Sequence, residues 1–179
     1  MEKDWNMALN FLALIDQLRN WNDGSRNLAK EGWDKLHKLP RGKHLYSYLI
    51  GRYAPYTGSI NALIEELSVG YSQVSLKESP SIRNHLRSIH AVALANLAEL
   101  SGNIALSYSM PVDARFIVAK MEIEYHKKAR GTVTAICECP IPENSEKQTY
   151  LVPVRIVNDA NEVVCTAVLH SLVGPKKSA

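Results

Sequence analysis

Residues 88–108 read SIHAVALANLAELSGNIALSY, a run in which alanine, leucine, isoleucine and valine predominate. As an α-helix this stretch would be apolar on nearly every side, which is typical of a helix buried inside a protein. Its alanines would allow neighbouring elements to approach closely. A membrane span needs about 20 apolar residues, whereas this stretch contains serines, asparagines and Gly102, and Pro111 follows it. We therefore predict a long buried helix and no membrane span.

Alternation of apolar and polar residues flanks the predicted helix on both sides. Before it, residues 63–69 and 71–77 alternate around a turn at Gly70. After it come four alternating runs, residues 117–125, 132–139, 150–157 and 163–173. In the first of these, one buried face would be formed by Ile117, Ala119, Met121, Ile123 and Tyr125. Because strands joined by short connections are antiparallel neighbours, we predict an α+β fold in which a curved antiparallel sheet wraps around one long buried helix.

The N-terminal part of the chain has helical periodicity. Apolar residues between Trp5 and Trp21 recur every three to four positions, and residues 33–39 fit a second short helix. The sequence therefore predicts three regions. Residues 1–45 form a helical extension that packs on the main domain, residues 46–174 form that domain, and residues 175–179 form a frayed tail.

Composition restricts the class of protein. Of the 179 residues, 46% are apolar and 22% are charged, which suits one globular domain and excludes a disordered chain. The net charge of +3 is too small to indicate binding to nucleic acid. The first residues, MEKDW, lack the apolar run of a signal peptide, and three cysteines do not suggest a disulfide framework, so we expect a cytoplasmic protein. Cys137 and Cys139 lack further ligands at suitable spacing, so we expect no metal.

One acidic residue, Glu99, interrupts the apolar helix. Burying an unpaired carboxylate costs several kcal/mol. Either Glu99 reaches solvent or a basic partner at the edge of the fold, or it stays in apolar surroundings because a function requires it. Glu99 is therefore a candidate catalytic residue.

The start of the helix offers a second candidate, His90, which we expect in the first turn with Ser88 as the N-cap. The first N–H groups of a helix have no partner within it, so they could stabilise the oxyanion that forms when a carbonyl is attacked. His90 could instead only complete the helix start. It lies about 13 Å from Glu99 along the helix axis and on the opposite face. If both residues act at one site, two antiparallel copies of the helix must lie side by side, which predicts an obligate homodimer with two composite sites.

These residues resemble the hotdog-fold acyl-CoA thioesterases of the phenylacetate-pathway type. Those enzymes have an asparagine, then a histidine that begins a His-Gly-Gly turn, then an acidic residue, at the spacing of Asn84, His90 and Glu99. The resemblance runs from about Leu39 to Val173. A bacterial subgroup of the same fold, long classed as a domain of unknown function, is still more similar over residues 54–59, 83–85, 90–99 and 127–131.

The resemblance implies a thioester hydrolase of the hotdog fold that releases free acid and coenzyme A without a cofactor. Its sites would lie at the interface of a homodimer or of a dimer of dimers. By this resemblance Glu99 would activate water or act as the nucleophile, and Asn84 of the partner subunit would orient the water or the carboxylate. The amide of Ala91, in a turn fixed by His90, would polarise the thioester carbonyl.

Two features depart from the family. The Gly-Gly after the histidine is Ala91-Val92 here, so Val92 would narrow the slot for the thioester. The acid is Glu99 rather than the aspartate of the phenylacetate type.

A basic turn adds candidate substrate-binding residues. Lys127, Lys128 and Arg130 could bind the phosphates of coenzyme A, since basic side chains pair with phosphate. The same residues could instead form a solvated hairpin tip that discourages edge-to-edge aggregation.

Two other functions stay open. A hydratase or dehydratase of this fold needs an aspartate and a histidine close together, where this chain has Asn84. A non-catalytic acyl-CoA-binding protein is favoured by Ala91-Val92 in place of the glycines. No basic stripe indicates that such a protein contacts DNA.

Overall fold

The computed structural model describes residues 26–176. Its elements, in chain order, are α2 (Leu28–Leu36), α3 (Gly42–Tyr53), α4 (Pro55–Gly58), β1 (Leu63–Ser68), β2 (Tyr71–Lys77), the short 3-10 helix η1 (Pro80–Ile82), α5 (Ala91–Ser109), β3 (Ala114–Tyr125), β4 (Thr132–Glu138), β5 (Gln148–Asn158) and β6 (Val163–Pro175). Two strands, one long helix and four further strands follow one another as predicted. The helix predicted between Trp5 and Trp21 and most of the predicted tail lie outside the described residues.

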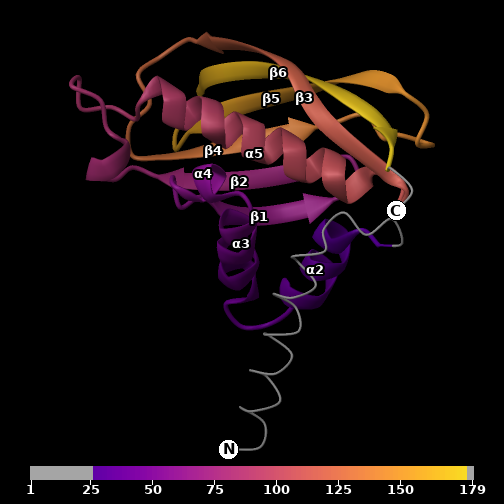
Figure 1. Ribbon diagram of the computed structural model, residues 1–179. Coiled ribbons are helices and arrows are strands. Elements are labelled where there is room, and N and C mark those ends of the chain that lie inside the picture. The colour runs from indigo at the N-terminus through magenta and orange to yellow at the C-terminus, as the bar shows by residue number, and fades with distance from the viewer. Residues whose placement is uncertain (1–25, 177–179) are drawn as a thin grey trace, which may run out of the picture.

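The six strands form one antiparallel sheet that curves around α5 (Figure 1). Their order is β1-β2-β4-β5-β6-β3, so β1 and β3 are the two edges. α5 lies along one face of this sheet, while α3 packs against β1 and α2 packs against α3 and α5. This is the predicted α+β architecture, and it leaves β3 with one unpaired side.

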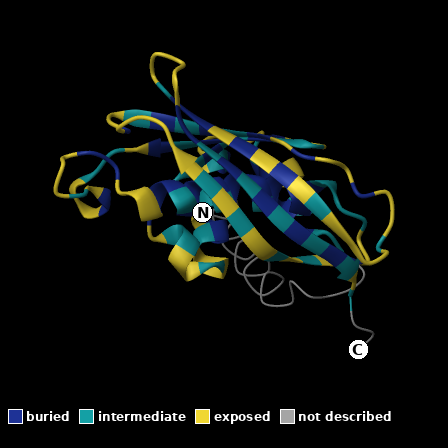
Figure 2. Ribbon diagram, turned by 90° about the horizontal axis from the view of Figure 1, so that it is seen from above, coloured by how far each residue is buried: buried dark blue, intermediate teal, exposed yellow. Residues whose placement is uncertain are grey.

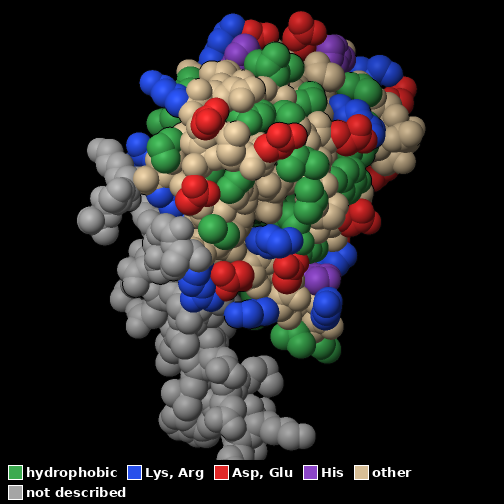
Figure 3. Space-filling model, turned by 90° about the vertical axis from the view of Figure 1, so that its right-hand side faces the viewer, with side chains coloured by type: hydrophobic (Ala, Val, Ile, Leu, Met, Phe, Trp, Pro, Cys, Tyr) green, Lys and Arg blue, Asp and Glu red, His purple; other side chains and the backbone are tan. Residues whose placement is uncertain are grey.

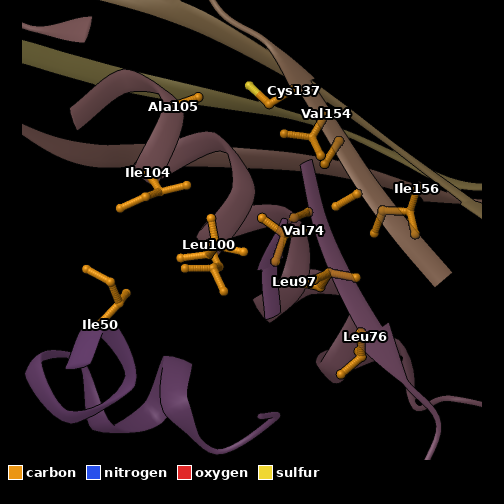
Figure 4. Packing of buried hydrophobic residues seen from close by; sticks show 14 of the residues in the cluster. Ile50, Val74, Leu76, Leu97, Leu100, Ile104, Ala105, Cys137, Val154 and Ile156 are labelled. Carbon is orange, nitrogen blue, oxygen red and sulfur yellow. The ribbon is translucent and has the colours of Figure 1, made fainter. Parts of the chain in front are cut away.

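The side of α5 turned to the sheet supplies the centre of the core. Leu97 and Ala105 have no exposed surface and lie among strand residues such as Val74 and Val154 (Figure 4). One position on this side must be small. A Cβ on Gly102 would lie 2.4 Å from Cδ1 of Leu169 on β6 and 3.2 Å from Cγ1 of Val152 on β5, so glycine there lets both strands approach the helix.

A β-bulge in β3 changes which of its residues face the core. The pairing with β6 shifts at Ala119, which has no partner across the ladder. Met121 and Ile123 are half-buried, but Ala119 is exposed, Ile117 is 65% exposed and Tyr125 is 46% exposed. The prediction that all five residues share one buried face was therefore wrong at three positions. One extra residue in a strand inverts the alternation beyond it, and at Tyr125 the strand ends. The bands of buried and exposed residues along the strands are visible from above (Figure 2).

The helix predicted at residues 33–39 starts earlier, because Asn27 caps α2 with its side chain. The amide of Asn27 also donates to the carbonyl of Ser107 at 2.7 Å, which ties α2 to α5. Trp33 and Tyr46 stack edge to face with ring centroids 5.2 Å apart, which joins α2 to α3. The division of the chain at residue 45 stays a prediction.

The surface of the described residues carries charges of both signs. On the face shown in Figure 3, acidic and basic side chains are interspersed among apolar ones. No helix within residues 26–176 is long and apolar enough to cross a membrane.

Candidate functional site

His90 is the N-cap of α5. Its backbone is extended (φ −65°, ψ 141°), and its Nδ1 accepts a hydrogen bond of 3.1 Å from the N–H of Val92. The carbonyl of His90 accepts from the N–H groups of Ala93 and Leu94. The sequence predicts Ser88 as the cap. That prediction was wrong because an imidazole nitrogen serves as the capping acceptor here, and the helix begins at Ala91.

The first residue of α5 presents an unused backbone donor. Among residues 26–176, no acceptor receives the N–H of Ala91. The carbonyl of Ala91 accepts from the Tyr125 hydroxyl at 3.1 Å, which links the helix start to the end of β3. His90 and Ala91 are exposed, and Val92 is 52% exposed. The donor is therefore reachable from outside the protomer, beside an apolar side chain.

Asn84 holds the loop that leads into α5. Its Oδ1 accepts from the N–H of Leu86 at 2.9 Å, and from the N–H and the hydroxyl of Ser88 at 3.2 Å each. Its Nδ2 donates to nothing in the described part of the chain. Hydrogen bonds within the loop thus occupy Oδ1 of Asn84, and the N–H groups of Nδ2 are left for an acceptor outside the described part of this protomer.

The basic turn lies next to the same loop, because the N–H of Ile89 donates to the carbonyl of Ala129 at 2.9 Å. Lys127 pairs with Glu162 at 2.6 Å, and this ion pair lowers the pKa of the Glu162 carboxyl. Lys128 and Arg130 are exposed on either side of the buried Ala129. The fold therefore gathers Asn84, the helix start and the exposed basic residues Lys128 and Arg130 at one end of α5.

Glu99 lies elsewhere on the helix. Between its two ends α5 is buried as predicted except along one stripe formed by Val92, Ala95, Glu99 and Asn103, which no element within residues 26–176 fully covers. Glu99 is half-buried in this stripe and forms no ion pair with any described residue. Its one hydrogen bond is from Nδ2 of Asn103 to Oε1, at 3.5 Å.

A cavity of about 390 Å³ adjoins Glu99 and Asn103, between the second half of α5 and the first half of β3. Apolar and polar side chains line it in about equal measure, among them those of Met110, Phe116 and Arg115. None of residues 84–92 lines it. Within one protomer, the structure therefore separates Glu99 from the helix start that carries His90 and Ala91.

Sequence reasoning missed two residues of this site. Tyr125 was assigned to the buried face of β3, and nothing in its pattern indicated a contact with the helix start. Asn103 follows Glu99 by four positions, a spacing that places two helical residues on the same face. That spacing was a usable signal, although it does not show that the surrounding fold leaves both residues uncovered.

The three cysteines, Cys137, Cys139 and Cys165, are buried and form no disulfide. Burial raises the pKa of the Cys165 thiol to about 11. A hydrogen bond with Cys139, together with burial, raises the pKa of Cys137. Within residues 26–176, no group of three or more His, Cys, Asp or Glu side chains is placed to hold a metal ion.

A sequence model of the family described as "Domain of unknown function (DUF4442)" matches residues 42–173. No protein with a curated description matches the chain.

Solved structures share the fold. A protein solved as genomics APC5556 is 29% identical, and the match covers 82% of this chain and 97% of that one with a TM-score of 0.71. PA5026 of Pseudomonas aeruginosa, described as a protein of unknown function and probable thioesterase, is 20% identical over 76% of this chain and 97% of its own, with a TM-score of 0.66. The PaaI protein from the phenylacetic acid degradation operon of E. coli is 18% identical over 75% and 96%, with a TM-score of 0.56. The predicted hotdog fold is thereby confirmed.

Proposed function

We propose that this chain, which belongs to the DUF4442 family of domains of unknown function, hydrolyses an acyl-CoA thioester to a free acid and coenzyme A. The observation that carries the proposal is Glu99. A carboxylate that is half-buried, forms no ion pair with a described residue and adjoins a cavity lined by both apolar and polar side chains is available as a base. Similarity in fold to PaaI and to a probable thioesterase supports the same reaction.

The active unit is a homodimer. A single protomer has the base at Glu99 and an oxyanion donor at Ala91, but they do not share a cavity. Two features favour a partner copy against this side of the molecule. β3 is an edge strand, and the stripe of α5 from Val92 to Asn103 is incompletely covered. Two antiparallel copies of α5 would bring the Glu99 of each subunit to the helix start of the other.

The reaction follows from these groups. Glu99 removes a proton from water as the water oxygen attacks the thioester carbonyl carbon. The negative charge that develops on the carbonyl oxygen is stabilised by the N–H of Ala91 of the partner subunit. When the tetrahedral intermediate collapses, the carbon–sulfur bond breaks, and the thiolate receives the proton held by Glu99. The products are a carboxylic acid and a thiol, and the carboxylate of Glu99 is restored.

Asn84 and His90 support this arrangement. Because Oδ1 of Asn84 is already occupied, its Nδ2 is the atom that can donate to the carboxylate of Glu99 across the dimer. His90 holds the helix start in place through its bond to Val92. Nδ2 of Asn84 would orient the Glu99 carboxylate rather than hold the water. The water oxygen needs its lone pair to attack the carbonyl carbon, so that lone pair is not available to accept a hydrogen bond from Asn84.

The phosphates of coenzyme A bind at Lys128 and Arg130. Both are exposed beside the loop that carries Asn84, and neither forms an ion pair with a described residue. Lys127 contributes less, because Glu162 already neutralises it. The buried, unbonded thiols suit a reducing cytoplasm.

A second candidate function is binding of acyl-CoA without turnover. One observation favours it: Val92 projects from the helix start, 52% exposed, where the related enzymes have a glycine. A side chain there restricts how closely a thioester approaches the N–H of Ala91.

Hydrolysis of a panel of short, medium, long and aromatic acyl-CoAs, followed by thiol release, tests the proposal. We expect turnover of at least one class, and a loss of kcat of about 10² to 10⁴-fold in Glu99→Gln, which keeps the shape of the side chain but cannot accept the proton. Tight acyl-CoA binding with equal thiol release by wild type and Glu99→Gln would instead support the binding function.

A further inference from the structure

Asn103 stands one helical turn beyond Glu99 on α5 and lines the same cavity. Its Nδ2 donates to Oε1 of Glu99 at 3.5 Å. Because an amide has its donor and acceptor on opposite branches, this bond sets the orientation of the group. Nδ2 is directed to the carboxylate, and Oδ1 is left for a different donor.

That Oδ1 atom is buried and accepts no hydrogen bond within residues 26–176. Leaving a buried acceptor unsatisfied costs about 1–3 kcal/mol, so nearly all such atoms in proteins have a partner, often an ordered water. Only two other buried side-chain atoms of the described residues share this condition, Oδ1 of Asn96 and Oγ of Ser171, and neither residue lines the cavity.

Glu99 and Asn103 therefore line one cavity, each of them offers an oxygen acceptor, and a water molecule has two hydrogens to give. We propose that Asn103 and Glu99 together hold the water that attacks the thioester, an inference that rests on the proposed hydrolase function. One hydrogen of the water bonds to the Glu99 carboxylate and is transferred to it as a proton during the attack. The other bonds to Oδ1 of Asn103 and stays on the oxygen, becoming the hydroxyl of the tetrahedral intermediate. With both hydrogens held, a lone pair of the water oxygen is directed at the carbonyl carbon.

Substitution of Asn103 tests this role through kinetics. Asn103→Leu has a similar volume and no acceptor, so we expect kcat to fall about 10–100-fold, with KM within about twofold. Asn103→Asp keeps an oxygen acceptor at the same place but adds a negative charge beside Glu99. It should recover activity at high pH, with the acid limb of the pH–rate profile displaced to higher pH. The other ionisable groups lining the cavity are Arg26, Tyr53, Arg115 and Lys176, and they are unchanged in both variants.

Asn96→Leu is the matched control. Asn96 lies on the same helix, is 4% exposed, also has an unpartnered Oδ1, and donates from Nδ2 to the carbonyl of Tyr56 at 2.9 Å. The same substitution there should lower the stability of the protein yet leave kcat within about twofold of wild type. A purely structural role for Asn103 would make the two variants alike.

A crystal structure of the wild-type protein without substrate provides a readout apart from activity. We expect a water within hydrogen-bond distance of Glu99 and of Oδ1 of Asn103, and its loss in Asn103→Leu. A protein donor on Oδ1 in place of the water would overturn the inference.

The kinetic outcomes separate the two proposals. If the wild type hydrolyses a thioester and Asn103→Leu is as active as Asn96→Leu, the role of Asn103 is overturned and the proposed function stands. If the wild type hydrolyses no thioester, the proposed function fails, and the catalytic role of the water fails with it.

Discussion

Nδ1 of His90 accepts a hydrogen bond of 3.1 Å from the backbone N–H of Val92. A ring nitrogen that accepts from an N–H carries no proton itself, so in the neutral imidazole the proton is on Nε2. His90 therefore caps α5 through one nitrogen and has an N–H donor on the other. As long as the cap is intact, Nδ1 is not free to act as a general base.

The cap itself can be tested. His90→Ala should lower the free energy of unfolding by about 1 kcal/mol, whereas His90→Asn should restore most of it, because asparagine is among the best N-cap residues. Urea denaturation of both variants measures the difference. Equal stability of His90→Ala and the wild type would show that the bond to Val92 contributes nothing.

The oxyanion donor at Ala91 can be deleted without breaking the helix. Proline is well tolerated at the first helical position and has no N–H, and the extended backbone of His90 is the conformation that a following proline requires. We expect Ala91→Pro to lower kcat about 10² to 10³-fold with an unchanged circular dichroism spectrum. Ala91→Gly retains the N–H and is the control. A fully active Ala91→Pro would remove the Ala91 amide from the mechanism.

Composite sites predict complementation between two inactive variants. Glu99→Gln and Ala91→Pro each damage both sites of their own homodimer. In a mixed dimer, both substitutions fall in one site and the other site is intact. Equal amounts unfolded and refolded together should therefore regain roughly a quarter of wild-type activity. If activity stays at the level of the separate variants, Glu99 and Ala91 act within one chain or do not act together.

The packing of α5 against the sheet predicts a sharp size limit at Gly102. Gly102→Ala places a methyl group 2.4 Å from Leu169, and we expect it to destabilise the protein by about 1–3 kcal/mol. Gly174→Ala, at a position with no atom within 4 Å of the added Cβ, is the control and should change stability little. Thermal unfolding compares the two. Equal melting temperatures would mean that the sheet moves away from the helix at negligible cost.

The burial of Cys165 should lower the stability of the folded protein at alkaline pH. Its pKa is raised from 9.0 to about 11 in the folded protein, because the buried thiolate is poorly solvated. The unfolded chain then loses the proton first as pH rises. Stability linked to this group is complete below pH 9 and declines by roughly 2 kcal/mol up to pH 11. Cys165→Ala lacks this decline, so the difference in unfolding free energy between wild type and variant should change across that interval. A constant difference from pH 8 to pH 11 would contradict the raised pKa.

Much of the fold could be predicted because the relevant signals are local. The period of two in residues 71–77 and 132–139, and the apolar run at residues 88–108, identify strands and a helix whose order matches the structure. The bulge at Ala119 could not be predicted, since it depends on how β3 pairs with β6 rather than on the pattern of β3 itself.

The candidate site, too, could be predicted only in part. The apolar surroundings singled out Glu99 and the helix start singled out His90, whereas the role of Asn84 came from the resemblance. The spacing of His90 and Glu99 predicted that they belong to different copies of the helix if both act at one site. It did not identify Lys127 as the partner of Glu162, because those two residues come together only when separate turns pack side by side. Nor did it identify Tyr125 as a partner of Ala91, which needs the end of an edge strand to reach the helix start.

The amino-acid sequence by itself determined the order of elements and the presence of one apolar helix with an acidic residue, Glu99, near its middle. Hydrophobic periodicity is a property of neighbouring residues, so it can be recognised without the fold. Only the tertiary structure decided which stripe of that helix stays uncovered and which amide oxygen is left without a donor. Both depend on where β3 and the N-terminal helices pack, and packing between segments far apart in the chain is set by the whole core rather than by any stretch of it.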